Sequence, residues 1–236
     1  DMLTGSSSGG SGGDIHLVVG GGDSGSGGDV MISAGLSSAS SSSGGDIQVV
    51  AGQGSSTSLS DGGNGGSMFL TAGEADGLST SLDHGGNVSV HGGASQSGLG
   101  GSLSIMSGKS TATSSGSVSL GSVDAGVSGV SGNVSVVTGS SSAGSSGLMS
   151  LSTGDAVGGA GGDIHLVVGG GDSGSGGDLL MSAGHSSASM YGLGGDVMLS
   201  GGSSDLYEGG SMTFVSGHGK STDSGSISLL TSDAGL

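Results

Sequence analysis

The chain has no cysteine, no proline and no tryptophan among its 236 residues, and only two residues are lysine or arginine. Without cysteine it can form neither disulfides nor thiolate metal sites. Two basic residues against 19 acidic ones give a net charge of −17. Such a surface repels phosphate backbones, so we expect no nucleic-acid binding. No apolar run approaches the roughly twenty residues that cross a bilayer, so we expect no membrane insertion.

Glycine supplies 61 residues, and a repeated phrase organises them. The eighteen residues from Gly12 to Asp29, GGDIHLVVGGGDSGSGGD, return unchanged from Gly161 to Asp178. Each repeat unit begins with Gly/Ser-Gly, continues with Asp, Asn or Ser and an apolar–any–apolar triplet, and usually reaches another Gly. Fourteen such units form one array, most often at intervals of fifteen residues, beginning at Gly12, Gly27, Gly44, Gly65, Gly85, Gly100, Ser115, Ser131, Ser146, Gly161, Gly176, Gly194, Gly209 and Ser224.

The apolar residues of each unit alternate with period two, which is typical of a strand with one buried face. Stacking one strand per turn would bury each apolar pair against the next. The sequence therefore predicts an all-β fold, a flattened parallel β-solenoid of 14 to 15 coils of about 15 residues each. The rival fold is a bundle of polyproline-type helices, which would not need alternating aliphatic residues. In the solenoid the inward columns comprise Ile15, Leu17, Val30, Ile32, Ile164, Leu166, Val197 and Leu199.

Two further features concern the glycines and the ends of the chain. The glycine before each strand suits a sharp corner with positive φ. Residues 1–5 are similar to the strand end of another coil, and residues 233–236 match the middle of a unit, with no capping segment at either end. We therefore expect an uncapped stack that continues into a longer array or into the next subunit.

An aspartate follows the glycine pair in two blocks of units. Stacked coils would place these carboxylates about 4.8 Å apart on one edge, where a divalent cation such as calcium would relieve their repulsion. The alternative is a short polar side chain that satisfies a corner amide, since Asn87, Asn133, Ser102, Ser117 and Ser226 occupy the same place in other units. The candidate calcium ligands are Asp14, Asp29, Asp46, Asp163, Asp178 and Asp196.

Other motifs are weaker. Residues 24–31, SGSGGDVM, approach the calcium-binding nonapeptide without its tandem spacing. GDSGS at 22–26 and 171–175 is similar to a serine-protease nucleophile loop, and GSSSG at 5–9 fits the esterase elbow. Neither motif has a base with its orienting acid nearby in the sequence, and the histidines are scattered singly, so we expect no enzyme.

Two sequons, Asn87-Val88-Ser89 and Asn133-Val134-Ser135, occupy the same outward position of their units and are candidate glycosylation sites in a secreted protein. Phrases such as SGVSGNVSVVTGSSSAGSSG (residues 128–147) resemble the very large Gly/Ser-rich repeat proteins of diatoms and related algae. The resemblance implies an extracellular or cell-surface array that carries glycans, and it transfers no catalytic residue.

Three functions follow from these observations. The first is a structural protein of an extracellular filament, surface hair or cell wall that assembles from copies of itself. The second is a binding module that presents a polar face to polysaccharide, mineral or ice. The third and weakest is a polysaccharide-acting enzyme, for which the cations Lys109 and Lys220 are too few to build a charged cleft.

Overall fold

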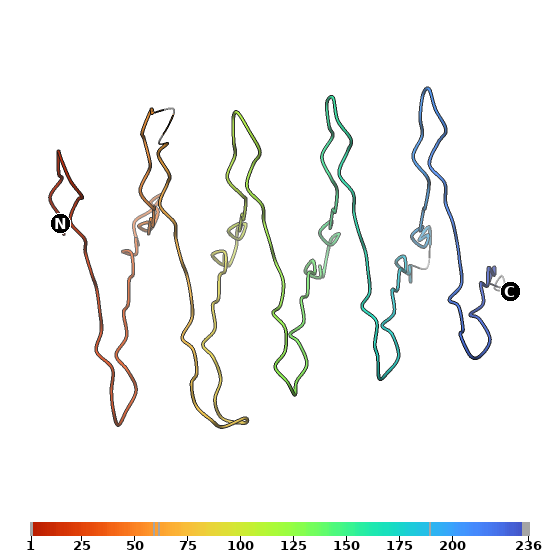
Figure 1. The fold of residues 1–236 in the computed structure, drawn as a ribbon, viewed down its shortest axis with the longest axis horizontal. Coiled ribbons are helices and arrows are strands. Elements are labelled where there is room, and N and C mark those ends of the chain that lie inside the picture. The colour runs from red at the N-terminus through yellow and green to blue at the C-terminus, as the bar shows by residue number, and fades with distance from the viewer. Residues whose placement is uncertain (1, 59, 61, 189, 233–236) are drawn as a thin grey trace. The chain divides into compact units, whose positions relative to one another are not determined.

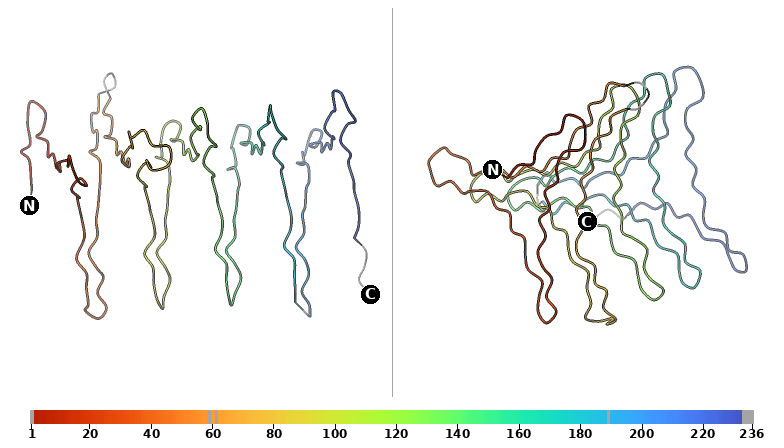
Figure 2. Two further views of the ribbon diagram at one scale, coloured as in Figure 1. Left: turned by 90° about the horizontal axis from the view of Figure 1, so that it is seen from below. Right: turned by 60° about the vertical axis from the view of Figure 1, so that its left-hand side comes forward.

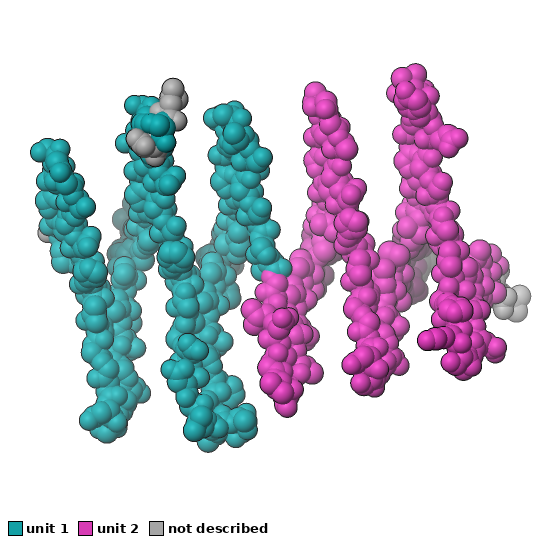
Figure 3. All heavy atoms as spheres, viewed as in Figure 1, with its two compact units in different colours: residues 1–120 teal, residues 121–236 magenta. Residues whose placement is uncertain are grey.

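The computed structural model of the chain describes residues 2–58, 60, 62–188 and 190–232 (Figure 1). Across these residues the structure contains no helix and no β-strand, so there are no element bounds to give. The chain divides into two compact units, Asp1–Leu120 and Gly121–Leu236 (Figure 3). Within each unit, extended segments alternate with loops at which the chain reverses direction (Figures 1 and 2). No helix in the described part is long and apolar enough to span a membrane.

The predicted β-solenoid is therefore wrong. A parallel stack needs consecutive segments to run in the same direction, one above the next, with repeated hydrogen bonds between them. Here the chain reverses at each loop, so consecutive segments form the two arms of that loop (Figure 1). The predictions of flattened coils and of uncapped ends depended on that stack and are wrong with it. Residues 1 and 233–236, which belong to the predicted ends, lie outside the described residues.

The buried apolar columns predicted for the solenoid are also absent. None of the described residues is a buried hydrophobic one, so the described chain has no core. Ile15 is 51% exposed and Ile164 is 47% exposed. Because neighbouring segments cover them only in part, the side chains named for the inward columns all remain exposed, namely Ile15, Leu17, Val30, Ile32, Ile164, Leu166, Val197 and Leu199.

The period-two alternation is nevertheless present within each extended segment. We number the residues after the glycine pair as segment positions 1 to 6, so that 14–19 and 163–168 are two such segments. At position 5, Val18 and Val167 are 85% and 86% exposed, well above the isoleucines at position 2. Positions 2 and 4 thus form a partly shielded apolar face, and positions 3 and 5 face away from it.

Nine of the loops are closed by one recurring backbone hydrogen bond. The second glycine of a pair donates its N–H to the carbonyl of the glycine that ends the preceding segment, which we call the closing glycine. Gly45 donates to Gly35 over 2.8 Å, and Gly101 donates to Gly93 over 2.8 Å. The same bond recurs at Gly28–Gly20, Gly66–Gly52, Gly86–Gly73, Gly116–Gly108, Gly195–Gly184, Gly210–Gly202 and Gly225–Gly217. The longer units differ in the residues inside these closed loops, such as 53–65 and 74–85.

Close approach, and not positive φ, favours glycine as the second residue of several pairs. A Cβ on Gly101 would lie 2.9 Å from the backbone nitrogen of Gly93. A Cβ on Gly28 would lie 2.6 Å from Cγ1 of Val19. Among the described glycines, only Gly62 and Gly158 adopt a left-handed φ, and both lie inside loops. The expectation of a positive-φ corner before each segment is therefore wrong.

Candidate functional site

The six candidate calcium ligands are not gathered into one place. Within the described residues, no group of three His, Cys, Asp or Glu side chains is arranged to hold a metal ion. The edge ladder was a consequence of stacked coils, and the structure lacks that stack. Calcium binding by Asp14, Asp29, Asp46, Asp163, Asp178 and Asp196 stays a prediction that only a binding measurement can test.

Two of these aspartates lie beside a histidine instead. Asp14 Oδ2 is 3.9 Å from His16 Nε2, and Asp163 Oδ2 is 3.8 Å from His165 Nε2. The partners occupy segment positions 1 and 3, so both side chains lie on the face opposite the apolar positions. All four side chains are more than four-fifths exposed, and such a pair contributes little to stability in water. These contacts show chiefly which face carries the charge.

The alternative for segment position 1 was a short polar side chain that hydrogen-bonds to a corner amide. The structure satisfies that amide in a different way. The amide that needs a partner is that of the second glycine, and in nine loops it donates to the carbonyl of the closing glycine. No position-1 side chain of the described residues accepts a hydrogen bond from a backbone amide. Asp, Asn and Ser interchange there because the side chain is exposed in every such unit.

The serine motifs that resemble hydrolase sequences make only local contacts. The Oγ of Ser24 donates to Asp23 over 3.2 Å, and that of Ser173 donates to Asp172 over 3.1 Å. Both bonds join adjacent exposed residues. Residues 5–9 are exposed throughout. One serine–histidine contact exists, between Ser89 Oγ and His91 Nε2, at segment positions 3 and 5 of one unit. Since it is exposed and no acid orients the histidine, this pair offers no activated nucleophile.

Both sequon asparagines are exposed at segment position 1 of extended backbone. Asn87 and Asn133 present their amides on the same face as the serine two residues later, because alternate side chains share a face. This geometry leaves both acceptor amides accessible to a modifying enzyme. The sequons therefore stay candidates for glycosylation on the polar face of the segments.

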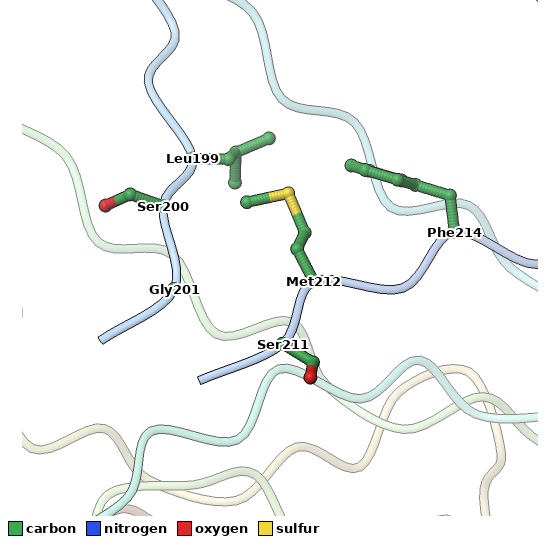
Figure 4. A pocket seen from close by; sticks show the side chains of 6 residues that line it. All are labelled: Leu199, Ser200, Gly201, Ser211, Met212 and Phe214. Atoms are coloured by element: carbon green, nitrogen blue, oxygen red, sulfur yellow. The ribbon is translucent and has the colours of Figure 1, made fainter. Parts of the chain in front are cut away.

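An open apolar hollow lies between two consecutive units across a loop. Leu199, at position 4 of one segment, and Met212, at position 2 of the next, turn their side chains toward each other (Figure 4). The ring of Phe214 faces the same hollow, which has a volume of about 250 Å³ (Figure 4). Apart from Ser200, Gly201 and Ser211 at its base, the hollow is apolar. It offers no charged or catalytic group and is a packing surface that remains largely open.

Two local features of the loops were not predicted from the sequence. The first is a serine placed two residues after a closing glycine, whose Oγ accepts the amide three residues later. Ser95 accepts from Gly98 over 2.9 Å, and Ser141 accepts from Gly144 over 3.1 Å. Ser110 and Ser204 do the same for Thr113 and Tyr207. The recurring Gly-x-Ser motif in the sequence could have predicted these turns.

The second feature is the residue at segment position 6, which faces the second glycine of the next unit. Where this residue is alanine, as at Ala34, Ala51, Ala72 and Ala183, the closing bond measures 2.8 to 2.9 Å. Where it is Val19, the bond lengthens to 3.5 Å. Where it is Thr138, Thr153 or Val168, the described part of the chain has no such bond. A β-branched side chain at position 6 therefore goes with a long or absent closing bond, although the described loop after Ser122 also lacks the bond.

Comparing the chain with protein-family models, with curated proteins and with solved structures yields no match in any of the three.

Proposed function

We propose that this chain is a structural repeat protein of an extracellular filament, surface hair or cell wall, in which copies of the chain join end to end and side by side. Its residues serve as a repeated surface and carry no catalysis. The resemblance to the large Gly/Ser-rich repeat proteins of diatoms and related algae supports this proposal, as do the two exposed sequons.

The observation that carries the proposal is the equivalence of distant repeats. The identical stretches 12–29 and 161–178 lie in different compact units, yet their side-chain contacts agree, and they differ in the closing bond that is 3.5 Å long at Gly28–Gly20 and missing, among the described residues, at Gly177. Their Asp–His distances are 3.9 and 3.8 Å. In both, a Cβ added to the second glycine of the next pair would lie 2.6 to 2.8 Å from Cγ1 of the valine at position 6. A surface that is repeated unchanged along the chain suits a filament, because a filament makes the same contact at many points along its length. An enzyme needs one unique constellation.

Immunogold labelling of the source cells tests this function. Antibodies raised against the recombinant chain should decorate surface fibres or wall material along their length. Labelling confined to the cell interior would contradict an extracellular structural role. The same antibodies, after adsorption with the recombinant chain, provide the control for non-specific labelling.

A further inference from the structure

The exposed surface of the chain is far larger than a folded monomer leaves in water. The accessible area is 22962 Å² for a chain of 21.4 kDa. A compact monomer of this mass exposes roughly 9,000 Å², and a fully unfolded one exposes about 31,000 Å². The difference from the compact value, about 14,000 Å², is many times the ~800 Å² that one partner buries in a standard interface. A partner that covers this surface must run along the whole chain.

The backbone of the segments is unpaired as well as exposed. Across the described residues, the backbone bonds between neighbouring arms are the single loop-closing bonds between glycines. The segment residues between the two glycines, such as 14–19 and 163–168, make no backbone hydrogen bond to another segment. Extended backbone with free N–H and C=O groups is a template for pairing with another chain.

The apolar face of each segment also lacks a segment that covers it fully. Even at the hollow between Leu199, Met212 and Phe214, these side chains stay 56%, 45% and 67% exposed. The arms of one loop therefore shield only part of each apolar pair. Side chains of this size stabilise a structure by ~1.5–3 kcal/mol each when they are fully buried. The remaining half of every pair is available to a further segment.

From the area, the unpaired backbone and the half-covered apolar pairs, we propose that the extended segments of one chain pair side by side with those of other copies of the same chain, so that the copies interleave along their length. This proposal deepens the structural role and rests on it. The copies would exchange backbone hydrogen bonds and cover one another's apolar residues at positions 2 and 4.

A second copy fits this surface better than an unrelated partner. The segments of a second copy have the same length, the same alternation and the same spacing along the chain as those of the first. A single register therefore pairs many segments of the two copies at once. The charge is compatible with this arrangement. Asp14 and Asp163 lie with their histidines on the opposite face, so the apolar faces can close while the carboxylates stay in water. Like charge still opposes association, and salt should favour it.

Matched variants of the full chain test the pairing by mass. Replacing Ile15 and Ile164 with Ser removes two apolar side chains from position 2. Replacing Val18 and Val167 with Ser removes two from the outward position 5 of the same segments. In sedimentation velocity, the wild type should form oligomers. The position-2 variant should need at least roughly tenfold more protein for half-assembly, and the position-5 variant should stay within about twofold of wild type. A wild type that is monomeric at every concentration, or equal effects of both variants, would overturn the proposal.

A spin label shows whether segments of different copies meet. Because the chain has no cysteine, a single Ser104→Cys variant carries one label, and any spin–spin broadening must come from another copy. Position 104 lies in an extended segment, and Ser97→Cys in the loop 94–100 is the control. We expect strong broadening at 104 that dilution with unlabelled chain removes, and weaker broadening at 97. Filaments without broadening at 104 would overturn side-by-side pairing but leave the structural function intact. Pairing without surface labelling of cells would contradict the function and leave pairing intact.

Discussion

In several pairs the second glycine is required by close contact with the end of the preceding segment. Gly101 shows this most directly, because a Cβ there would meet backbone atoms of Gly93 that cannot rotate away. The first residue of the pair is less constrained, since a Cβ on Gly100 would lie 3.6 Å from its nearest neighbour and the tightest case is Gly209 at 3.2 Å. Serine replaces the first glycine at Ser115, Ser131, Ser146 and Ser224, while the second residue is glycine in every unit. In these four units a Cβ on the second glycine would make only ordinary contacts, the nearest at 3.4 to 3.6 Å, so close contact does not explain the glycine there.

Gly101→Ala should open its loop. The added methyl group would push the amide of residue 101 away from the carbonyl of Gly93 and break a 2.8 Å hydrogen bond. Losing one such bond costs about 1 kcal/mol, so exchange of the residue-101 amide with deuterium should accelerate by about fivefold. Gly100→Ala is the matched control, because its nearest neighbour would be 3.6 Å away. Equal acceleration in both variants would show that contact does not select the glycine.

The size of the residue at segment position 6 tunes the same bond from the other side. Val19→Ala should let Gly28 approach Gly20 as closely as Gly45 approaches Gly35, shortening a 3.5 Å bond toward 2.8 Å. Exchange of the Gly28 amide, measured by NMR, should therefore slow. The reverse change, Ala34→Val, should speed exchange at Gly45. Unchanged rates in both variants would contradict this account.

Glycosylation is a prediction at the same scale. Asn87 and Asn133 are exposed on extended backbone, and an attached glycan would project from the polar face without disturbing the apolar positions. Mass spectrometry of the native protein should find glycan on at least one of them if the chain passes through a glycosylating secretory pathway. Peptides that carry both asparagines unmodified would count against that route.

At the scale of the loop, a serine side chain restrains the turn by accepting a backbone hydrogen bond, which glycine cannot do. Ser95→Ala should free the Gly98 amide, which now donates to Ser95 Oγ over 2.9 Å. The cost should be about 0.5–1.5 kcal/mol of loop stability. The observable is faster deuterium exchange at Gly98. Ser95→Asp should restore protection, because a carboxylate oxygen accepts the same bond. If Ser95→Asp exchanges as fast as Ser95→Ala, the bond does not hold the loop.

At the scale of the segment, the sequence could establish which side chains share a face and could not establish what covers that face. Period two places Ile15 and Leu17 together and His16 opposite, and the Asp14–His16 contact agrees with that alternation. The error lay in taking consecutive units as stacked neighbours. A period-two pattern carries no information about the backbone partner, so it fits a parallel stack, a loop arm or a segment of another chain equally well.

The candidate site illustrates the same limit. The six aspartates could be found from their place after the glycine pair, but their proximity depended entirely on the stack. By contrast, the loop-closing bond needs only residues of adjacent units, and its glycine pair and closing glycine are visible in the sequence. Features that depend on local spacing could therefore be predicted, whereas features that depend on the long-range partner could not.

For the whole molecule, the net charge of −17 decides how assembly responds to ions. Sodium chloride can only screen the repulsion, and the screening length falls from ~30 Å at 0.01 M to ~8 Å at 0.15 M. Calcium at the same ionic strength should do more if carboxylates at segment position 1 share a cation. We expect calcium to raise the melting temperature of the assembled protein above the value in sodium. The double variant Asp29→Asn, Asp178→Asn should lose most of that excess, whereas Asp205→Asn, in the loop 203–209, should keep it. Identical melting temperatures in sodium and calcium at matched ionic strength would remove the calcium hypothesis and leave screening as the whole effect.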